Sequence, residues 1–262
     1  MLTPAEFRAL HRPGTPIVLP NAWDLASARW LHASGHAAIG TTSLGVAFAA
    51  GKRDGGGETA DDTFELARRI TRAGIPVSVD LEAGFSDDPD EVGRFAERLS
   101  HLGVVGINIE DSDASGRLVD FDLAAAKVAA IAAAAPELYL NARTDPFWIE
   151  SDADEPARHA DAVARARRYV DAGASGVFVP GTLSAATVAA LVRDIKAPLN
   201  VLVQGELSVP QLGSLGVARV STGSLLFRLA LGAISAAAAD IARGEFSPPP
   251  GIPSYVGIAL LP

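Results

Sequence analysis

Short runs of apolar residues recur along the chain, and each run is followed by turn or polar residues. The runs are too short for helices and are typical of buried parallel strands. The eight predicted strands cover residues 17–20, 37–41, 76–80, 105–110, 138–142, 176–180, 199–203 and 217–221.

The segments between these strands carry helix signals. Acidic residues and a proline mark a helix start at 88–91, and Gly74 and Gly173 lie where a helix should end before the next strand. Repeated strand–helix units of this kind predict an α/β fold, a TIM-type (β/α)8 barrel. A doubly wound sheet is the alternative, but no Gly-x-Gly-x-x-Gly motif follows the first strand.

We expect a single domain over residues 1–262, because a chain of this length lies within the range of one α/β barrel. A helix at about residues 3–11 should precede the barrel. A C-terminal helix followed by a proline-rich tail should occupy about residues 224–262.

Composition narrows the possible partners. The chain is 48% apolar and 20% charged, which is typical of a compact globule, and its net charge of −9 with no basic run argues against nucleic acid or an anionic membrane as a partner. The absence of cysteine excludes disulfides, thiolate metal sites and cysteine nucleophiles. The N-terminus is not a basic, apolar signal, and Arg228 interrupts the apolar stretch 225–239, so we expect a cytoplasmic protein without a membrane span.

Acidic residues lie where two of the predicted strands end, which is where barrel enzymes place their sites. Asp80 and Glu82 lie two residues apart and would share one face of an extended strand, and Glu110 and Asp111 end the next strand. Carboxylates that converge without lysine neighbours repel each other unless a cation neutralises them. An all-oxygen site suits Mg²⁺ or Mn²⁺, although helix caps or solvated loop acids are the alternative.

Two further strand ends carry groups that suit an anionic substrate. Backbone N–H groups of the segment 40–45 could hold a carboxylate or enolate oxygen, and Arg143 could bind a carboxylate or phosphonate in bidentate fashion. A plain Gly/Ser turn and a structural ion pair between Arg143 and a nearby acid are the alternatives. Surface or packing roles are expected for the five histidines, His11, His32, His36, His101 and His159.

Several strand-end motifs together resemble the isocitrate lyase/phosphoenolpyruvate mutase superfamily. The resemblance spans most of the predicted barrel, in order. It implies Mg²⁺, a small 2-oxo acid or dicarboxylate substrate, and a homo-oligomer, tetramer or dimer, in which a C-terminal helix is often exchanged. The motifs are Pro-Asn-Ala-Trp-Asp at 20–24, Thr-Thr-Ser at 41–43, Asp-Leu-Glu-Ala-Gly-Phe at 80–85, Gly-Ile-Asn-Ile-Glu-Asp at 106–111 and Asn-Ala-Arg-Thr-Asp at 141–145.

The resemblance also implies roles for individual residues. Asp80 would bind the metal directly, with Glu82 and Glu110 assisting largely through water, and Glu82 replaces the more frequent aspartate. Asp54 lines up with a family aspartate beside the substrate and the metal waters. The implied substrate-binding residues are Trp23, Thr42, Ser43, Leu44, Gly45, Asp80, Arg143 and Asn200, and the implied catalytic residues are Asp54 and Arg143. Arg117, in the loop that follows the Glu-Asp pair, is a third candidate catalytic residue.

One departure from the family limits the possible reactions. The isocitrate and methylisocitrate lyases carry a Lys-x-Cys-Gly-His gate after the Glu-Asp pair, whereas segment 112–119 here has no cysteine, histidine or lysine and only Asp113 and Arg117 as ionisable groups. Their carboxylate after the sixth strand is also absent from 179–182. Those two activities are therefore disfavoured, because the cysteine general acid has no counterpart.

The sequence leaves three functions open. A Mg²⁺-dependent C–C bond lyase that forms an enolate-like intermediate ranks first. A phosphoenolpyruvate/phosphonopyruvate mutase, or a C–P or C–C hydrolase, is the alternative within the superfamily. A non-catalytic sensor or scaffold that binds a 2-oxo acid is an alternative of another class.

Overall fold

The computed structural model describes residues 2–149 and 152–261 and contains one sheet of parallel strands. The sheet order is β1-β9-β8-β7-β6-β5-β4-β3-β2. The strands are β1 (Ile17–Leu19), β2 (Asn21–Ala22), β3 (Ile39–Thr41), β4 (Val77–Asp80), β5 (Gly106–Glu110), β6 (Tyr139–Arg143), β7 (Gly176–Phe178), β8 (Leu199–Leu202) and β9 (Arg219–Ser221).

The two ends of this sheet order are consecutive in the chain, so the sheet closes on itself. β1 pairs with β9 and β2 pairs with β3, and only Pro20 separates β1 from β2. Proline has no N–H to donate to a neighbouring strand, and the Pro20 carbonyl accepts a hydrogen bond from the Gly40 N–H at 2.8 Å. The first barrel strand is thus divided at Pro20 and continues as β2 beyond its predicted end, and the predicted (β/α)8 barrel is confirmed.

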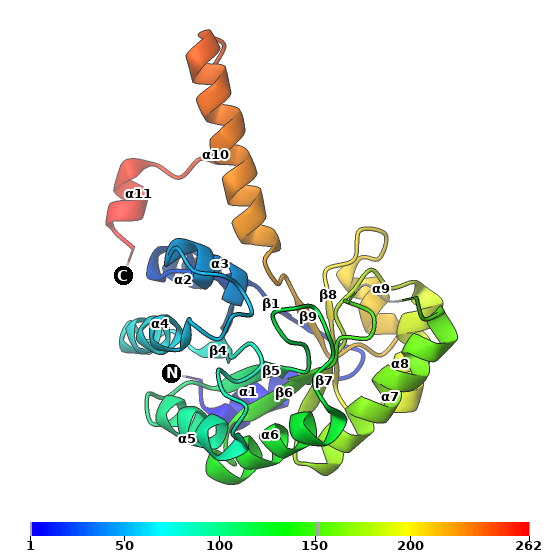
Figure 1. Ribbon diagram of the computed structural model, residues 1–262. Helices are drawn as coiled ribbons and strands as arrows, with labels where there is room; N and C mark the ends of the chain where they lie inside the picture. Colours follow the sequence, from blue (N-terminus) through cyan, green and yellow to red (C-terminus); the bar gives the residue numbers. More distant parts are fainter. Residues whose placement is uncertain (1, 150–151, 262) are drawn as a thin grey trace.

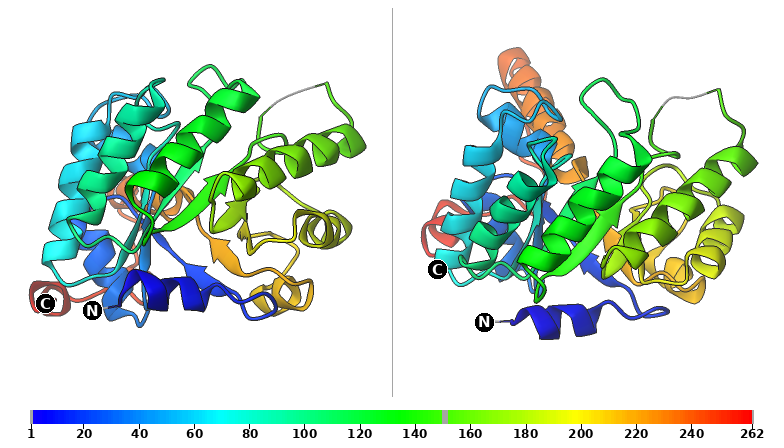
Figure 2. Two further views of the ribbon diagram at one scale, coloured as in Figure 1. Left: turned by 90° about the horizontal axis from the view of Figure 1, so that it is seen from below. Right: turned by 60° about the horizontal axis from the view of Figure 1, so that its bottom comes forward.

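Helices cover the outside of the barrel and its lower end (Figures 1 and 2). The predicted N-terminal helix is present as α1, where Thr3 and Glu6 form a capping box. It lies across the end of the barrel at which the strands begin, and Phe7 packs there against Val105 and Tyr139. The helices are α1 (Pro4–Leu10), α2 (Leu25–Ala33), α3 (Ser43–Ala49), α4 (Ala60–Arg72), α5 (Pro89–Ser100), α6 (Phe121–Ala134), α7 (Glu155–Asp171), α8 (Ala185–Ile195), α9 (Val209–Ser214), α10 (Leu225–Arg243) and α11 (Tyr255–Ala259).

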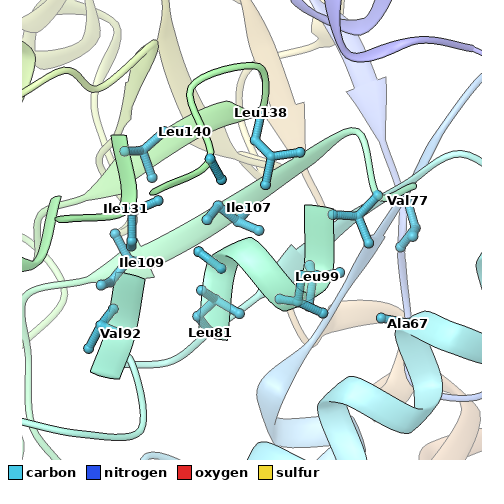
Figure 3. Close-up of a cluster of buried hydrophobic side chains, with 14 of the residues drawn as sticks. Ala67, Val77, Leu81, Val92, Leu99, Ile107, Ile109, Ile131, Leu138 and Leu140 are labelled. Carbon is cyan, nitrogen blue, oxygen red and sulfur yellow. The ribbon is translucent and has the colours of Figure 1, made fainter. Parts of the chain in front are cut away.

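The hydrophobic core lies between the strands and these helices. Outward-facing Ile107 and Leu140 of neighbouring strands meet Leu99 of α5 and Ile131 of α6 (Figure 3), and all four are buried. Burying each such side chain stabilises the fold by about 1.5–3 kcal/mol. Because outward positions supply the core, the alternate positions on each strand face the barrel axis, and many of these are polar.

Helix α10 leaves the barrel and stands away from it (Figure 1), and only Phe227 of its residues is buried. It is long and apolar enough to cross a membrane by length and composition, so Arg228 does not by itself exclude a membrane span for this stretch. Length and composition alone do not distinguish a membrane helix from one that packs against protein. The proline-rich tail that follows contains the short helix α11, which the sequence patterns do not predict.

Candidate active site

A cavity of about 870 Å³ opens where the barrel strands end. The carboxylates of Asp54, Asp80 and Glu110 line it together with the guanidinium of Arg143. These side chains come from three strands and from the loop after α3, so closure of the barrel brings together residues far apart in sequence. This is the position at which TIM-barrel enzymes carry their active sites.

Asp80 ends β4 and is held from the neighbouring strand and helix. Its backbone N–H donates to Thr41 Oγ1 at 2.8 Å, and its Oδ2 accepts from the Ser43 N–H at 3.1 Å. Burial raises the pKa of Asp80 although the charge of Arg143 opposes the shift, and burial likewise raises the pKa of Glu110 well above its ordinary value. For both carboxylates, the effect of burial on the pKa exceeds the opposing effect of the Arg143 charge.

Arg143 lies between two carboxylates and two aromatic rings. It forms ion pairs with Glu110 and, through Nε at 2.7 Å, with Asp145. Its guanidinium carbon lies 5.5 Å from the ring centre of Trp148 and 5.8 Å from that of Phe178. Burial lowers the pKa of Arg143, but Asp145 and Glu110 more than offset that effect, so the guanidinium stays charged. Arg143 therefore forms the structural ion pair with a nearby acid and also lies in the cavity, so the two alternatives predicted for it are both compatible with the structure.

Glu82 departs from its expected orientation. β4 ends at Asp80 and Glu82 has a φ of 50°, so the expectation that these two residues share one face of an extended strand is wrong. The buried Glu82 carboxylate accepts hydrogen bonds from the Gly57 N–H at 3.1 Å and from the Thr59 hydroxyl. Glu82 does not line the cavity and instead fastens the loop that carries Asp54.

The other predicted substrate-binding residues divide into two groups. Thr42, Ser43 and Leu44 line the cavity, as predicted for this segment. Trp23, Gly45 and Asn200 do not. A Cβ atom on Gly45 would lie 2.5 Å from Cβ of Trp23, so this glycine is needed for the close packing of Trp23. Asn200 is buried below the cavity and accepts a hydrogen bond from Ser221 Oγ at 3.0 Å.

Arg117 and its loop cover one side of the cavity. The segment 112–117 lines it, and the loop is closed by a bridge between Ser112 and Leu118. The Arg117 side chain is 80% exposed, lies 3.7 Å from Asp113 and donates from Nε to Ser115 Oγ at 2.8 Å. It is thus at the cavity mouth but engaged within its own loop.

Three positions in or beside the cavity are not among the residues predicted from the sequence. Asp145 is fully buried and forms an ion pair with Arg143. It is the last residue of the Asn-Ala-Arg-Thr-Asp motif, but the sequence alone assigns it no role. Arg228, noted only as an interruption, lines the cavity mouth from α10. Asp111 faces away from the cavity, where it accepts hydrogen bonds from Thr144 Oγ1 at 2.8 Å and Tyr169 Oη at 2.7 Å, so it supports the site from outside.

The donor set fits a hard divalent cation. Asp54 Oδ1 is buried, lines the cavity and has no hydrogen-bond partner in residues 2–149 and 152–261. In the same described part of the chain, no three acidic or histidine side chains converge closely enough to hold an ion by themselves. Mg²⁺ commonly takes one or two carboxylates and keeps several waters, so Asp80 as a direct ligand with Asp54 and Glu110 behind water suits it.

The comparisons with known proteins agree with this geometry. The family model for phosphoenolpyruvate phosphomutase matches residues 7–242, and the chain therefore belongs to the phosphoenolpyruvate mutase/isocitrate lyase superfamily. This superfamily comprises lyases, mutases and hydrolases that bind small acids and typically use Mg²⁺.

Individual relatives are similar over nearly the whole chain. An uncharacterized protein of Mycobacterium tuberculosis (strain CDC 1551 / Oshkosh) is 45% identical over 243 residues, which cover 93% of this chain and 91% of the relative. A Burkholderia cenocepacia J2315 structure, named provisionally as a phosphonomutase, is 38% identical with a TM-score of 0.84 over 90% of this chain and 98% of that one. The structure of 2,3-dimethylmalate lyase is 25% identical with a TM-score of 0.83, over 100% and 95%.

Proposed function

We propose that this protein is a Mg²⁺-dependent enzyme that cleaves a C–C bond in a small 2-oxo acid or 2-hydroxy dicarboxylate through an enolate-like intermediate. The observation that carries the proposal is the cavity at the strand ends, where the carboxylates of Asp54, Asp80 and Glu110 line the same space as the guanidinium of Arg143. Such a site suits a divalent cation and an anionic substrate together. Bound there by Asp80, with Asp54 and Glu110 behind water, Mg²⁺ would supply positive charge where the substrate's oxygens become negative.

The residues of the chain have distinct roles in this proposal. Arg143 binds a substrate carboxylate, and its paired carboxylates and flanking rings fix the plane of its guanidinium. The segment from Thr42 to Leu44 borders the substrate oxygens. Asp54 accepts the proton of the substrate's 2-hydroxyl, because its Oδ1 faces the cavity without another partner among the described residues.

The bond changes balance without a further reactant. As the 2-hydroxyl loses its proton, the C2–C3 bond breaks and C2 becomes a carbonyl. The electron pair remains on C3, where the adjacent carboxylate stabilises it as an enolate-like anion, and C3 then takes up a proton. Arg117 lies on the loop over the cavity and pairs with the second anionic group of the substrate when the loop closes.

The walls of the cavity favour a substituted substrate. Phe178, Pro180, Leu202 and Val203 line it beside the polar groups, so a substrate that carries alkyl groups next to its carboxylates would bury them there. The similarity to 2,3-dimethylmalate lyase agrees with this substrate class. Phosphonopyruvate mutase is the second candidate, because the Burkholderia cenocepacia relative is named provisionally as a phosphonomutase.

We also propose that α10 is covered in a homo-oligomer, a dimer or tetramer, rather than by a membrane. Leu229, Ile234 and Ile241 are each more than half exposed on this helix. The superfamily consists of soluble enzymes, which agrees with a cytoplasmic location and with a protein partner for this face. Sedimentation of the purified protein would show an oligomer, whereas a monomer that partitions into detergent would contradict the proposal.

Purified protein tested against oxaloacetate, phosphonopyruvate and substituted malates and citrates separates the candidates. We expect release of a 2-oxo acid from a substituted malate with Mg²⁺, and loss of that release with EDTA. Turnover of phosphonopyruvate alone would favour the mutase. Tight binding of 2-oxo acids with no turnover of any substrate would favour the sensor and contradict the proposal.

A further inference from the structure

The barrel interior below the cavity is polar, whereas barrels of this type usually fill it with branched apolar side chains. Ser78, Asn141 and Asn200 belong to the alternate strands β4, β6 and β8. Each lies two residues before the end of its strand, on the face that points to the barrel axis. The strand registers place these three residues in one layer of the barrel. All three are buried.

Arg219 lies in the layer beneath, with the glycines of β5 and β7. Gly106 and Gly176 let two aromatic side chains pack closely at this level, since a Cβ on Gly106 would lie 3.0 Å from Phe7 Cε1 and one on Gly176 only 2.1 Å from Tyr139 Oη. The Arg219 side chain is fully buried, and its Nε donates to Ser221 Oγ at 3.0 Å. Its Nη1 and Nη2 have no hydrogen-bond partner in the part of the chain that the structure describes.

Four other buried polar atoms in or beside these layers have no partner among the described residues. They are Ser78 Oγ, Asn141 Oδ1 and Asn200 Nδ2 in the layer above, and Nε2 of His11 at the end of α1. His11 Nδ1 lies 2.9 Å from the Phe7 carbonyl and donates to it, so Nε2 carries the lone pair. Burial, and then the charge of Arg219, lower the pKa of His11 to about 3, so the ring is neutral at pH 7.

This set mixes donors with acceptors. The Nη groups of Arg219 and Nδ2 of Asn200 donate, Oδ1 of Asn141 and Nε2 of His11 accept, and Ser78 can do either. An anion would satisfy only the donors and would face the Asn141 oxygen, whereas water satisfies both kinds. Leaving such atoms buried and unpaired would cost about 1–3 kcal/mol each, and more for the charged guanidinium.

We propose that Arg219, His11, Ser78, Asn141 and Asn200 enclose a buried hydration site on the barrel axis. Ordered water molecules there bridge the guanidinium to the amides above and to the imidazole below. Buried waters typically make about three hydrogen bonds to groups of this kind.

Arg219 lies beneath the cavity and acts as a positioning residue for groups of the active site. Ser221 lines the cavity, and its Oγ accepts from Arg219 Nε and donates to Asn200 Oδ1. The charge of Arg219 also interacts with Asp80. Arg219 therefore fixes one hydroxyl of the cavity floor and partly offsets the carboxylates, a role that rests on the proposed function.

A crystal structure of the wild-type protein tests the hydration site directly. We expect ordered waters within hydrogen-bond distance of both Arg219 Nη atoms and of at least one of Asn141 Oδ1 and His11 Nε2. Crystals grown in bromide show whether a halide takes this place. An anomalous peak at Arg219, or direct side-chain contacts that fill the space without water, would overturn the proposal.

Calorimetric titration with Mg²⁺ tests the effect on the active site. Arg219→Met removes a buried positive charge and should tighten Mg²⁺ binding about threefold to tenfold, while Arg219→Lys should stay close to wild type. Arg29→Met on α2 is the matched control and should leave the affinity unchanged. Equal affinities in wild type and Arg219→Met would overturn the positioning role. Wild-type protein that binds no Mg²⁺ would instead contradict the proposed function and leave the hydration site to the crystallographic result.

Discussion

The contact between Thr59 and Glu82 gives a sharp test of how the active-site loop is held. Thr59 occupies the N-cap position of α4, yet its fully buried hydroxyl donates to Glu82 instead of capping the helix. Thr59→Val keeps the shape of the side chain and leaves one oxygen of a buried carboxylate unpaired. A hydrogen bond to a charged group contributes about 1.5–3 kcal/mol, and each kcal/mol shifts the melting temperature of a domain of this size by about 2–4 °C, so the melting temperature should fall by roughly 3–12 °C.

Thermal unfolding and hydrogen exchange measure the two consequences. Exchange should rise in the loop from Gly55 to Glu58, because the Gly57 N–H donates to the same carboxylate. Thr71→Val is the matched control, since the Thr71 hydroxyl bonds only within its own helix, to Ala67 and Arg68. A Thr59→Val variant that melts and exchanges like this control would refute the assignment of Glu82 to the loop.

Three other perturbations have defined outcomes. Gly176→Ala places a Cβ 2.1 Å from Tyr139 Oη and should lower the free energy of unfolding by about 1–3 kcal/mol, measured by urea unfolding. Its control, Gly232→Ala, adds a Cβ in open space within α10 and should raise the free energy of unfolding by about 0.5–1 kcal/mol. Equal effects of the two substitutions would contradict the close approach of Tyr139 to Gly176. Burial, and then Asp145, raise the pKa of Asp111 to about 6 from 3.8, so its contribution to stability is full below pH 3.8 and is lost as the pH rises through 6. This loss of stability is on the order of 3 kcal/mol, and it should be missing when the stability of Asp111→Asn is measured against pH. The same pH dependence of stability in Asp111→Asn and wild type would contradict the raised pKa of Asp111. Arg143→Lys cannot make the bidentate contact and should lower kcat/KM at least tenfold for any substrate found; wild-type kinetics would exclude Arg143 from binding.

The barrel could be predicted from the sequence because its strands are marked by local patterns of apolar residues. Each predicted strand is present within two or three residues of its expected bounds, because apolar runs buried on the outer face need no long-range information to be recognised. The division at Pro20 was also readable in principle, since proline cannot donate to a neighbouring strand. The position of α10 away from the barrel and the presence of α11 could not be predicted, because they depend on what packs against these helices and the sequence of one chain does not reveal that.

The site is predictable in its residue types and less so in its geometry. Asp80, Glu110 and Arg143 meet in the cavity because alternate positions at neighbouring strand ends face the axis. Glu82 does not follow this rule, because the strand ends before it and its backbone turns left-handed. Asn200 stands one layer too low, and the depth of a residue along the axis depends on strand tilt and register, which local patterns do not reveal.

Exchange of the C2 protons of propionate with solvent in the presence of pyruvate, followed by NMR, tests the central claim most directly, because the proposed cleavage leaves its electron pair on the carbon next to a carboxylate. Enolisation needs both the metal carboxylates and the anion-binding groups but no knowledge of the natural substrate. We predict Mg²⁺-dependent exchange with the wild-type protein that EDTA stops, and none with Asp80→Ala, which should fold normally because Asp80 lies at the cavity and not in the hydrophobic core. Exchange that persists in Asp80→Ala, or that never occurs in wild-type protein saturated with Mg²⁺, would contradict the account.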